Sequence, residues 1–173
     1  ILNLEYYMQK DLYSDGDIEE QMLQMAKEGI TCETLSDEQV SFPVIYHFSD
    51  LRANILNWYP ITKSDSVLEI GAGCGAITGT LCEKAGQVTS VELSKRRAQI
   101  NYYRNENKKN LTIMVGNLND MDLGQQYDYV VVNGVLEYAM SFTEGDTPYE
   151  TFLRKMGSYL KDTGKLLIAI ENK

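Results

Sequence analysis

Histidine, proline and tryptophan are scarce in this sequence, which holds one His, three Pro and one Trp in 173 residues. The single histidine, His47, cannot build a zinc site without partners, and no Cys or second His stands at ligand spacing from it. We therefore predict no metal site and interpret His47 as a packed or hydrogen-bonded side chain.

Cysteine pairs and long apolar runs are also missing. The three cysteines, Cys32, Cys74 and Cys82, are an odd set without a C-x-x-C pair, which fits reduced thiols better than a disulfide framework. No apolar run approaches the length of a membrane span, about 20 residues, and no signal peptide is recognisable. These absences predict a cytoplasmic protein without membrane insertion.

Positive charge is in deficit, with 16 Lys and Arg against 25 Asp and Glu and a formal net charge of −9. A negative net charge disfavours binding to nucleic acid through overall electrostatic attraction, so we expect no nucleic-acid partner. The hydrophobic content of 43% and charged content of 24% are those of a soluble globular chain able to bury a core. The oligomeric state is not indicated.

One stretch, VLEIGAGCGA at residues 67–76, organises the rest of the chain. An apolar strand runs into three alternate glycines (Gly71, Gly73 and Gly75), and a helix follows at 76–85. Glycine permits both the sharp turn and a close backbone approach to a ligand. The amide groups of such a loop point into the crevice where open α/β sheets bind ligands.

Strands and helices alternate along the sequence, which predicts an α/β fold with a doubly wound, mainly parallel sheet. The expected strands after the first are 87–91, 111–115, 127–132 and 165–170. The expected helices are one capped by Asp17 and ending before Gly29, 49–59, 76–85, one capped by Ser94, and one capped by Thr147. The three cations Lys95, Arg96 and Arg97 oppose the helix dipole, and we interpret them as a solvated surface.

The chain divides into an N-terminal helical extension at 1–48 and a ligand-binding domain at 49–173. The Met-rich helix face around Met22 and Met25 predicts packing onto the domain, or alternatively a mobile lid, because Met adapts to irregular surfaces. Tyr46 and Arg52 are placed in sequence to approach the crevice from that side.

The glycine stretch resembles motif I of the class I S-adenosylmethionine (SAM)-dependent methyltransferases in its E-x-G-x-G-x-G form, with Glu69 two residues before Gly71. Gly71 to Ala76 also fits the G-x-G-x-x-G/A fingerprint of dinucleotide binders. Glu92 ends the second strand, where a carboxylate can accept hydrogen bonds from ribose hydroxyls; this placement is similar to methyltransferase motif II.

The resemblance implies SAM as cofactor and a set of residues around it. It implies that the glycine loop runs alongside the methionyl and ribose parts of SAM, that Glu69 binds the ammonium group and that Glu92 binds the ribose. The full cofactor set is Glu69, Gly71, Ala72, Gly73, Gly75, Glu92, Leu93, Asn117, Leu118 and Asn133. Asn117 stands where the family often has an acidic residue beside adenine, and its amide oxygen can still accept a hydrogen bond.

The run Asn133-Gly134-Val135-Leu136-Glu137-Tyr138 resembles motif IV, which lies beside the transferred methyl group. It departs from the N/D-P-P-Y/F form of methyltransferases that act on base or glutamine amino groups, which argues against such acceptors. Glu137 and Tyr138 are the catalytic candidates, as a general base or as structural groups.

The function predicted is methyl transfer from SAM to an oxygen or nitrogen of a small-molecule or saccharide acceptor. The alternatives are an NAD-dependent dehydrogenase and a non-catalytic SAM-binding module. Segments 46–58, 91–98 and 169–173 also resemble bacterial methyltransferases associated with cell-surface polysaccharide synthesis, which suggests a saccharide.

The resemblance covers residues 46–173, and the family's strand order is 3-2-1-4-5-7-6. The five expected strands would give the order 3-2-1-4-5, without the sixth and seventh. We therefore expect a C-terminally truncated portion of a larger protein, with the acceptor half incomplete.

Overall fold

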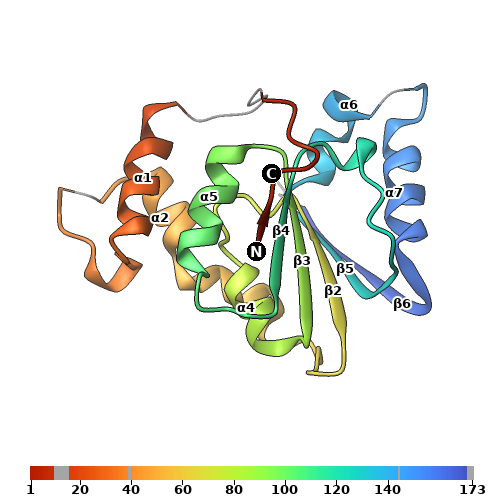
Figure 1. Ribbon diagram of the computed structural model, residues 1–173, viewed down its shortest axis with the longest axis horizontal. Helices are drawn as coiled ribbons and strands as arrows, with labels where there is room; N and C mark the ends of the chain where they lie inside the picture. The colour runs from red at the N-terminus through yellow and green to blue at the C-terminus, as the bar shows by residue number, and fades with distance from the viewer. Residues whose placement is uncertain (10–15, 39, 144, 171–173) are drawn as a thin grey trace.

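The computed structural model describes residues 1–9, 16–38, 40–143 and 145–170. Its centre is a six-stranded sheet in the order β1-β4-β3-β2-β5-β6, and every neighbouring pair is parallel (Figure 1). The strands are β1 (Leu2–Asn3), β2 (Ser66–Ile70), β3 (Gln87–Glu92), β4 (Leu111–Val115), β5 (Tyr127–Asn133) and β6 (Leu160–Ala169). The predicted order 3-2-1-4-5 is confirmed as β4-β3-β2-β5-β6.

Helices cover both faces of the sheet, which explains why the central strands β2 and β3 are buried along almost their whole length. Val67 of β2 joins the core on the face covered by α3 (Asn54–Asn57), α4 (Thr78–Lys84) and α5 (Lys95–Arg104). Its neighbour Leu68 points to the other face, where α7 (Pro148–Ser158) contributes Phe152 and Met156. The sheet is therefore doubly wound, as predicted.

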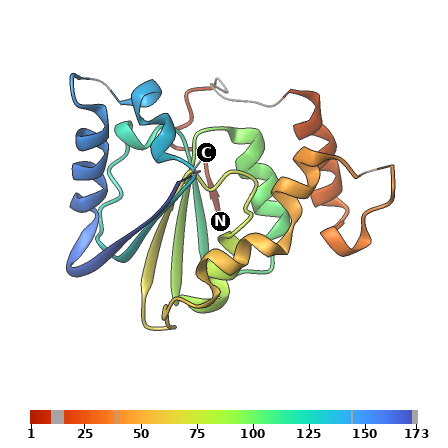
Figure 2. The ribbon, with the colours of Figure 1, turned by 180° about the vertical axis from the view of Figure 1, so that it is seen from behind.

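The N-terminal segment contributes one strand and two helices. β1 pairs with β4, Leu2 opposite Ile113, a strand that the sequence analysis did not predict. Helix α1 (Asp17–Lys27) packs on α5, and Met22 and Met25 are buried in a third cluster that includes Phe48 of α2 (Phe42–Phe48). Figures 1 and 2 show α1 and α2 at the opposite end of the molecule from α7. The packing interpretation of the Met-rich face is thus confirmed, and the lid remains a prediction.

Two boundaries differ from expectation. The predicted helix 49–59 is a 3-10 turn, η2 (Asp50–Ala53), followed by the short α3. Ser49 caps this segment, since its hydroxyl accepts from the amide of Leu51. Strand β6 begins before Gly164 and shifts register against β5 between Tyr127 and Tyr129. The remaining short elements are η1 (Cys32–Thr34), η3 (Leu118–Asp120), η4 (Leu136–Tyr138) and α6 (Ala139–Phe142).

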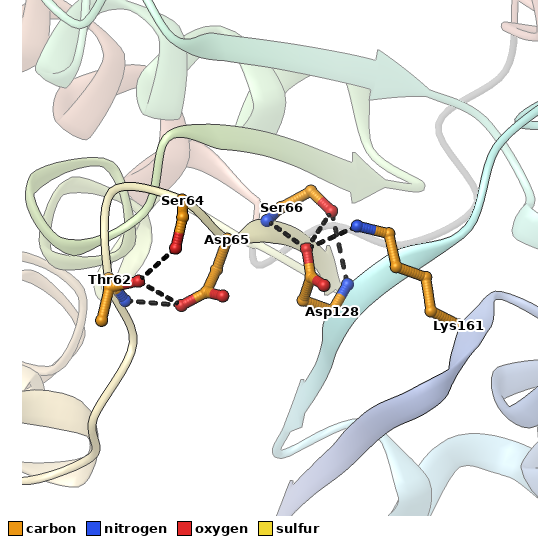
Figure 3. A network of polar contacts seen from close by, with 6 residues as sticks. All are labelled: Thr62, Ser64, Asp65, Ser66, Asp128 and Lys161. Carbon is orange, nitrogen blue, oxygen red and sulfur yellow. Dashed lines mark hydrogen bonds and ion pairs between the residues drawn. The ribbon is translucent and has the colours of Figure 1, made fainter.

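A polar network joins three strands at the end of the sheet away from the glycine loop (Figure 3). Asp128 Oδ2 of β5 accepts hydrogen bonds from the amide and hydroxyl of Ser66 in β2 and from Lys161 Nζ in β6, each at 2.8 Å. The Lys161 hydrogen bond, helped by those from Ser66, lowers the pKa of Asp128 to about 2. The network ties β2, β5 and β6 together where each strand begins.

In the described ranges, none of the helices has both the length and the apolarity needed to cross a bilayer.

Candidate functional site

A cavity of about 640 Å³ lies at the carboxyl ends of β2, β3, β4 and β5. Its volume is in the range of small-molecule sites, about 300–1,000 Å³. The chain leaves β2 toward β3 on one side and β5 lies on the other, so the cavity is at the point where the strand order reverses. Open parallel sheets bind ligands at this point.

The glycine loop after β2 forms one wall of this cavity. Gly71, Gly73 and Gly75 have φ values of 66°, 54° and 80°, a left-handed geometry that side chains with a Cβ rarely adopt. The amides of Gly71 and Ala72 both donate to the carbonyl of Val91, at 2.9 and 3.1 Å, which folds the loop back over β3. Ala72 and Gly73 line the cavity beside Gly71.

Gly75 has a different position from the other two glycines. It is not among the cavity-lining residues, and a Cβ there would overlap the side chain of Asn101 in α5. Glycine at position 75 is therefore explained by the close packing against α5 as well as by its φ value.

Glu92 ties the end of β3 to the glycine loop. Its Oε2 accepts from the amide of Gly73 at 2.7 Å and its Oε1 from the amide of Ser94 at 2.8 Å. The side chain lines the cavity and is 6% exposed, and this burial raises its pKa. Each carboxylate oxygen has a second lone pair, so Glu92 can accept further hydrogen bonds from ligand hydroxyls.

Glu69 lies at the base of the same cavity and is 2% exposed. Its Oε2 accepts from Thr78 Oγ1 at 2.7 Å and from Ser90 Oγ at 2.5 Å, whereas its Oε1 is buried without a hydrogen-bond partner among the described residues. Burial raises the pKa of Glu69 to about 7. A buried, partnerless carboxylate oxygen suits a positively charged ligand group.

Most of the other predicted residues line the cavity, and one does not. Those that line the cavity are Leu93, Asn117, Leu118, Asn133 and Tyr138. Asn117 Oδ1 also accepts from the amide of Asn119 at 2.9 Å and so caps η3. Glu137, the other catalytic candidate, is not among the lining residues.

Sequence reasoning missed the contribution of α2, which brings Phe42, Pro43 and His47 to the cavity beside Tyr46. Phe42, at the start of this helix, is 79% exposed. A signal was available, because Ser41 followed by Pro43 near the first helical position is typical of a helix start.

The interpretation of residues 95–97 as a solvated surface was wrong for Arg97. Arg97 lines the cavity, is 8% exposed and pairs with the fully buried Glu19 of α1. No sequence pattern links these two residues, because 78 positions separate them.

Tyr46 and Arg52, expected to approach the crevice, do line it, with the guanidinium 4.2 Å from the ring centroid. Across the parts of the chain that the structure describes, no group of three or more His, Cys, Asp or Glu side chains could hold a metal ion.

Comparison with known proteins gives consistent results. Residues 68–166 match the family model described as a methyltransferase domain. An uncharacterized methyltransferase of Staphylococcus carnosus is 32% identical over 116 residues, which are 67% of this chain and 52% of that protein. A phosphoethanolamine N-methyltransferase of Triticum aestivum is 30% identical over 118 residues, 66% of this chain and 22% of that protein. The chain thus spans about half of the first relative and less of the second.

Among solved structures, the complex of DhpI with S-adenosylhomocysteine aligns with a TM-score of 0.60 at 21% identity, over 90% of this chain and 70% of that one. This likeness supports the fold derived above.

Proposed function

Because this chain belongs to the class I SAM-dependent methyltransferase family, we propose that it is the cofactor-binding part of an enzyme that methylates an oxygen or nitrogen of a small-molecule or saccharide acceptor. The observation that carries the proposal is the convergence of Glu69, Glu92 and the glycine loop on one cavity. Family membership also leaves the NAD-dependent dehydrogenase alternative without support.

The residues around the cavity fit SAM. The partnerless Oε1 of Glu69 suits the ammonium group of the methionyl part, and the second lone pairs of Glu92 suit the two ribose hydroxyls. Asn117 and Leu118 would flank adenine, while the backbone from Gly71 to Gly73 would pass the methionyl and ribose parts. Leu93 and Asn133 complete the proposed set. Gly75 would act indirectly, through the shape of the loop.

When bound, SAM supplies a methyl group already activated on a sulfonium. The protein's work is then alignment of the acceptor and exclusion of water. Tyr138 is half-exposed at the cavity, where its hydroxyl can accept a hydrogen bond from an acceptor O–H or N–H and so orient the lone pair of the attacking atom. Glu137 lies one residue away, outside the lining, and would need to move to act as a base.

Four observations support a small-molecule or saccharide acceptor. The loop after β5 lacks the N/D-P-P-Y/F sequence, and one relative is named for phosphoethanolamine, a small molecule. The net charge of −9 disfavours nucleic acid. Aromatic groups at the cavity, Phe42 and Tyr46, would suit the apolar faces of a sugar.

Calorimetric titration with S-adenosylhomocysteine and, separately, with NAD tests the proposal. We expect saturable binding of S-adenosylhomocysteine alone. Binding of NAD alone, or of neither ligand, would contradict it. Transfer of labelled methyl groups from SAM to candidate acceptors then separates an enzyme from a non-catalytic SAM-binding module.

A further inference from the structure

Arg52 is a charged residue that lines the cavity and takes no part in the SAM contacts proposed for Glu69, Glu92 and the glycine loop. It lies in η2, between α2 and α3, and is half-buried. Its guanidinium stacks over Tyr46, whose ring in turn meets the ring of His47 edge-on, with centroids 5.1 Å apart. Stacking of this kind fixes the plane of a guanidinium while leaving its edge N–H groups available.

The other charged side chains of the cavity already have partners. Arg97 is paired with Glu19, Glu92 accepts from two backbone amides, and Glu69 accepts from two hydroxyls. Arg52, by contrast, has no ion-pair partner within the described residues, and its Nε is buried there without a hydrogen-bond acceptor. A buried N–H without an acceptor is unfavourable, and an anionic ligand group could relieve it.

A carboxylate entering this cavity needs such a cation. Two buried carboxylates, Glu69 and Glu92, line the same walls and would repel it. The methionyl end of SAM carries an ammonium and a carboxylate on one carbon atom, so a site for this end needs an anionic and a cationic partner close together. Glu69 with its partnerless oxygen supplies the first, and Arg52, a lining guanidinium without an ion pair among the described residues, supplies the second.

We propose that Arg52 binds the carboxylate of the methionyl group, with Tyr46 as the residue that positions its guanidinium. The inference rests on the proposed function, since it assumes that SAM occupies the cavity. It adds that α2 and η2, which precede β2 in the chain, form half of the site for the amino-acid end of the cofactor. A planar guanidinium can donate two parallel hydrogen bonds to a carboxylate, which a lysine cannot.

Two ligands separate this inference from the proposed function. S-adenosylhomocysteine carries the amino-acid end, whereas 5′-methylthioadenosine has the same nucleoside without it. Arg52→Met keeps a long side chain against Tyr46 but removes the charge. We expect Arg52→Met to weaken binding of S-adenosylhomocysteine by about 10- to 100-fold, the range for a hydrogen bond to a charged group, and to leave 5′-methylthioadenosine within about twofold.

Arg52→Lys is the conservative variant and should recover part of the lost affinity for S-adenosylhomocysteine only. Thermal unfolding of each variant checks the fold, and we expect Arg52→Met to melt close to wild type because Arg52 makes no ion pair within the described residues. Equal loss of affinity for both ligands, or no loss of affinity for S-adenosylhomocysteine, would overturn the role of Arg52. Binding of S-adenosylhomocysteine by the wild type would in either case still support the proposed function. A wild-type chain that binds neither ligand would overturn both.

Discussion

Arg97 donates from Nε to Glu19 Oε1 at 2.7 Å, and the two side chains are 10% and 0% exposed. This ion pair joins the first turn of α1 to the first turn of α5, and α5 begins shortly after Glu92, the last residue of β3. Arg97 also lines the cavity. The N-terminal helix is therefore anchored to the site by a buried charge, in addition to its Met-rich apolar face.

Glu19→Gln should destabilise the protein by about 3–5 kcal/mol, because it removes the carboxylate that is paired with the buried guanidinium of Arg97. Chemical denaturation measures the change. Glu20→Gln is the matched control, since Glu20 is 64% exposed and pairs with Arg96 at 3.7 Å, so its loss should cost about 0–1 kcal/mol. Adding Arg97→Met to Glu19→Gln should restore most of the stability. Equal unfolding curves for Glu19→Gln and Glu20→Gln would show that the pair is not a buried anchor.

Glu92→Ala should weaken S-adenosylhomocysteine binding by about 1.5–3 kcal/mol, the value of hydrogen bonds to a charged group. The variant also frees the amides of Gly73 and Ser94, so a circular dichroism melt must accompany the titration. Glu83→Ala, on the exposed side of α4 where Glu83 pairs with Lys108, is the control and should leave binding unchanged. An unaltered dissociation constant for Glu92→Ala in a folded protein would remove Glu92 from the site.

Glu69 should release a proton when the cofactor product binds near neutral pH. Burial raises its pKa to about 7, so the carboxyl is largely protonated at pH 6, and a ligand ammonium beside Oε1 would favour the ionised form. Calorimetry at pH 6 in buffers of different ionisation enthalpy should detect this release, and Glu69→Gln should abolish it. The same number of protons released by wild type and variant would assign the proton to another group.

Asp128 should stabilise the fold at neutral pH and cease to do so in acid. Its pKa is lowered to about 2, chiefly by the hydrogen bond from Lys161, whereas an unfolded Asp has a pKa of about 3.9. The contribution is therefore present above about pH 4 and is lost as pH falls toward 2. Wild type should exceed Asp128→Asn by about 1–2 kcal/mol at pH 7 in denaturant unfolding, and the difference should shrink between pH 4 and 2. A difference independent of pH would mean that shape, not charge, holds the network.

The sheet and the central residues of the site were predictable because the sequence patterns that indicate them are local. The strands β2, β4 and β5 are mainly apolar runs next to turn residues, and Glu92 stands at a strand end that the pattern itself locates. The two-residue strand β1 is too short to give a periodic signal, and it forms only because the edge of β4 is available to pair with it. Arg97 looked like surface because its partner Glu19 is distant in sequence.

The most direct test of the account is a crystal structure of the protein with S-adenosylhomocysteine. We predict the ligand in the cavity at the carboxyl ends of β2 and β3, with its ribose hydroxyls within hydrogen-bond distance of Glu92 and its ammonium beside Glu69. A nucleoside bound elsewhere, or bound in the cavity with its ribose away from Glu92, would contradict the assignment of this cavity as the SAM site.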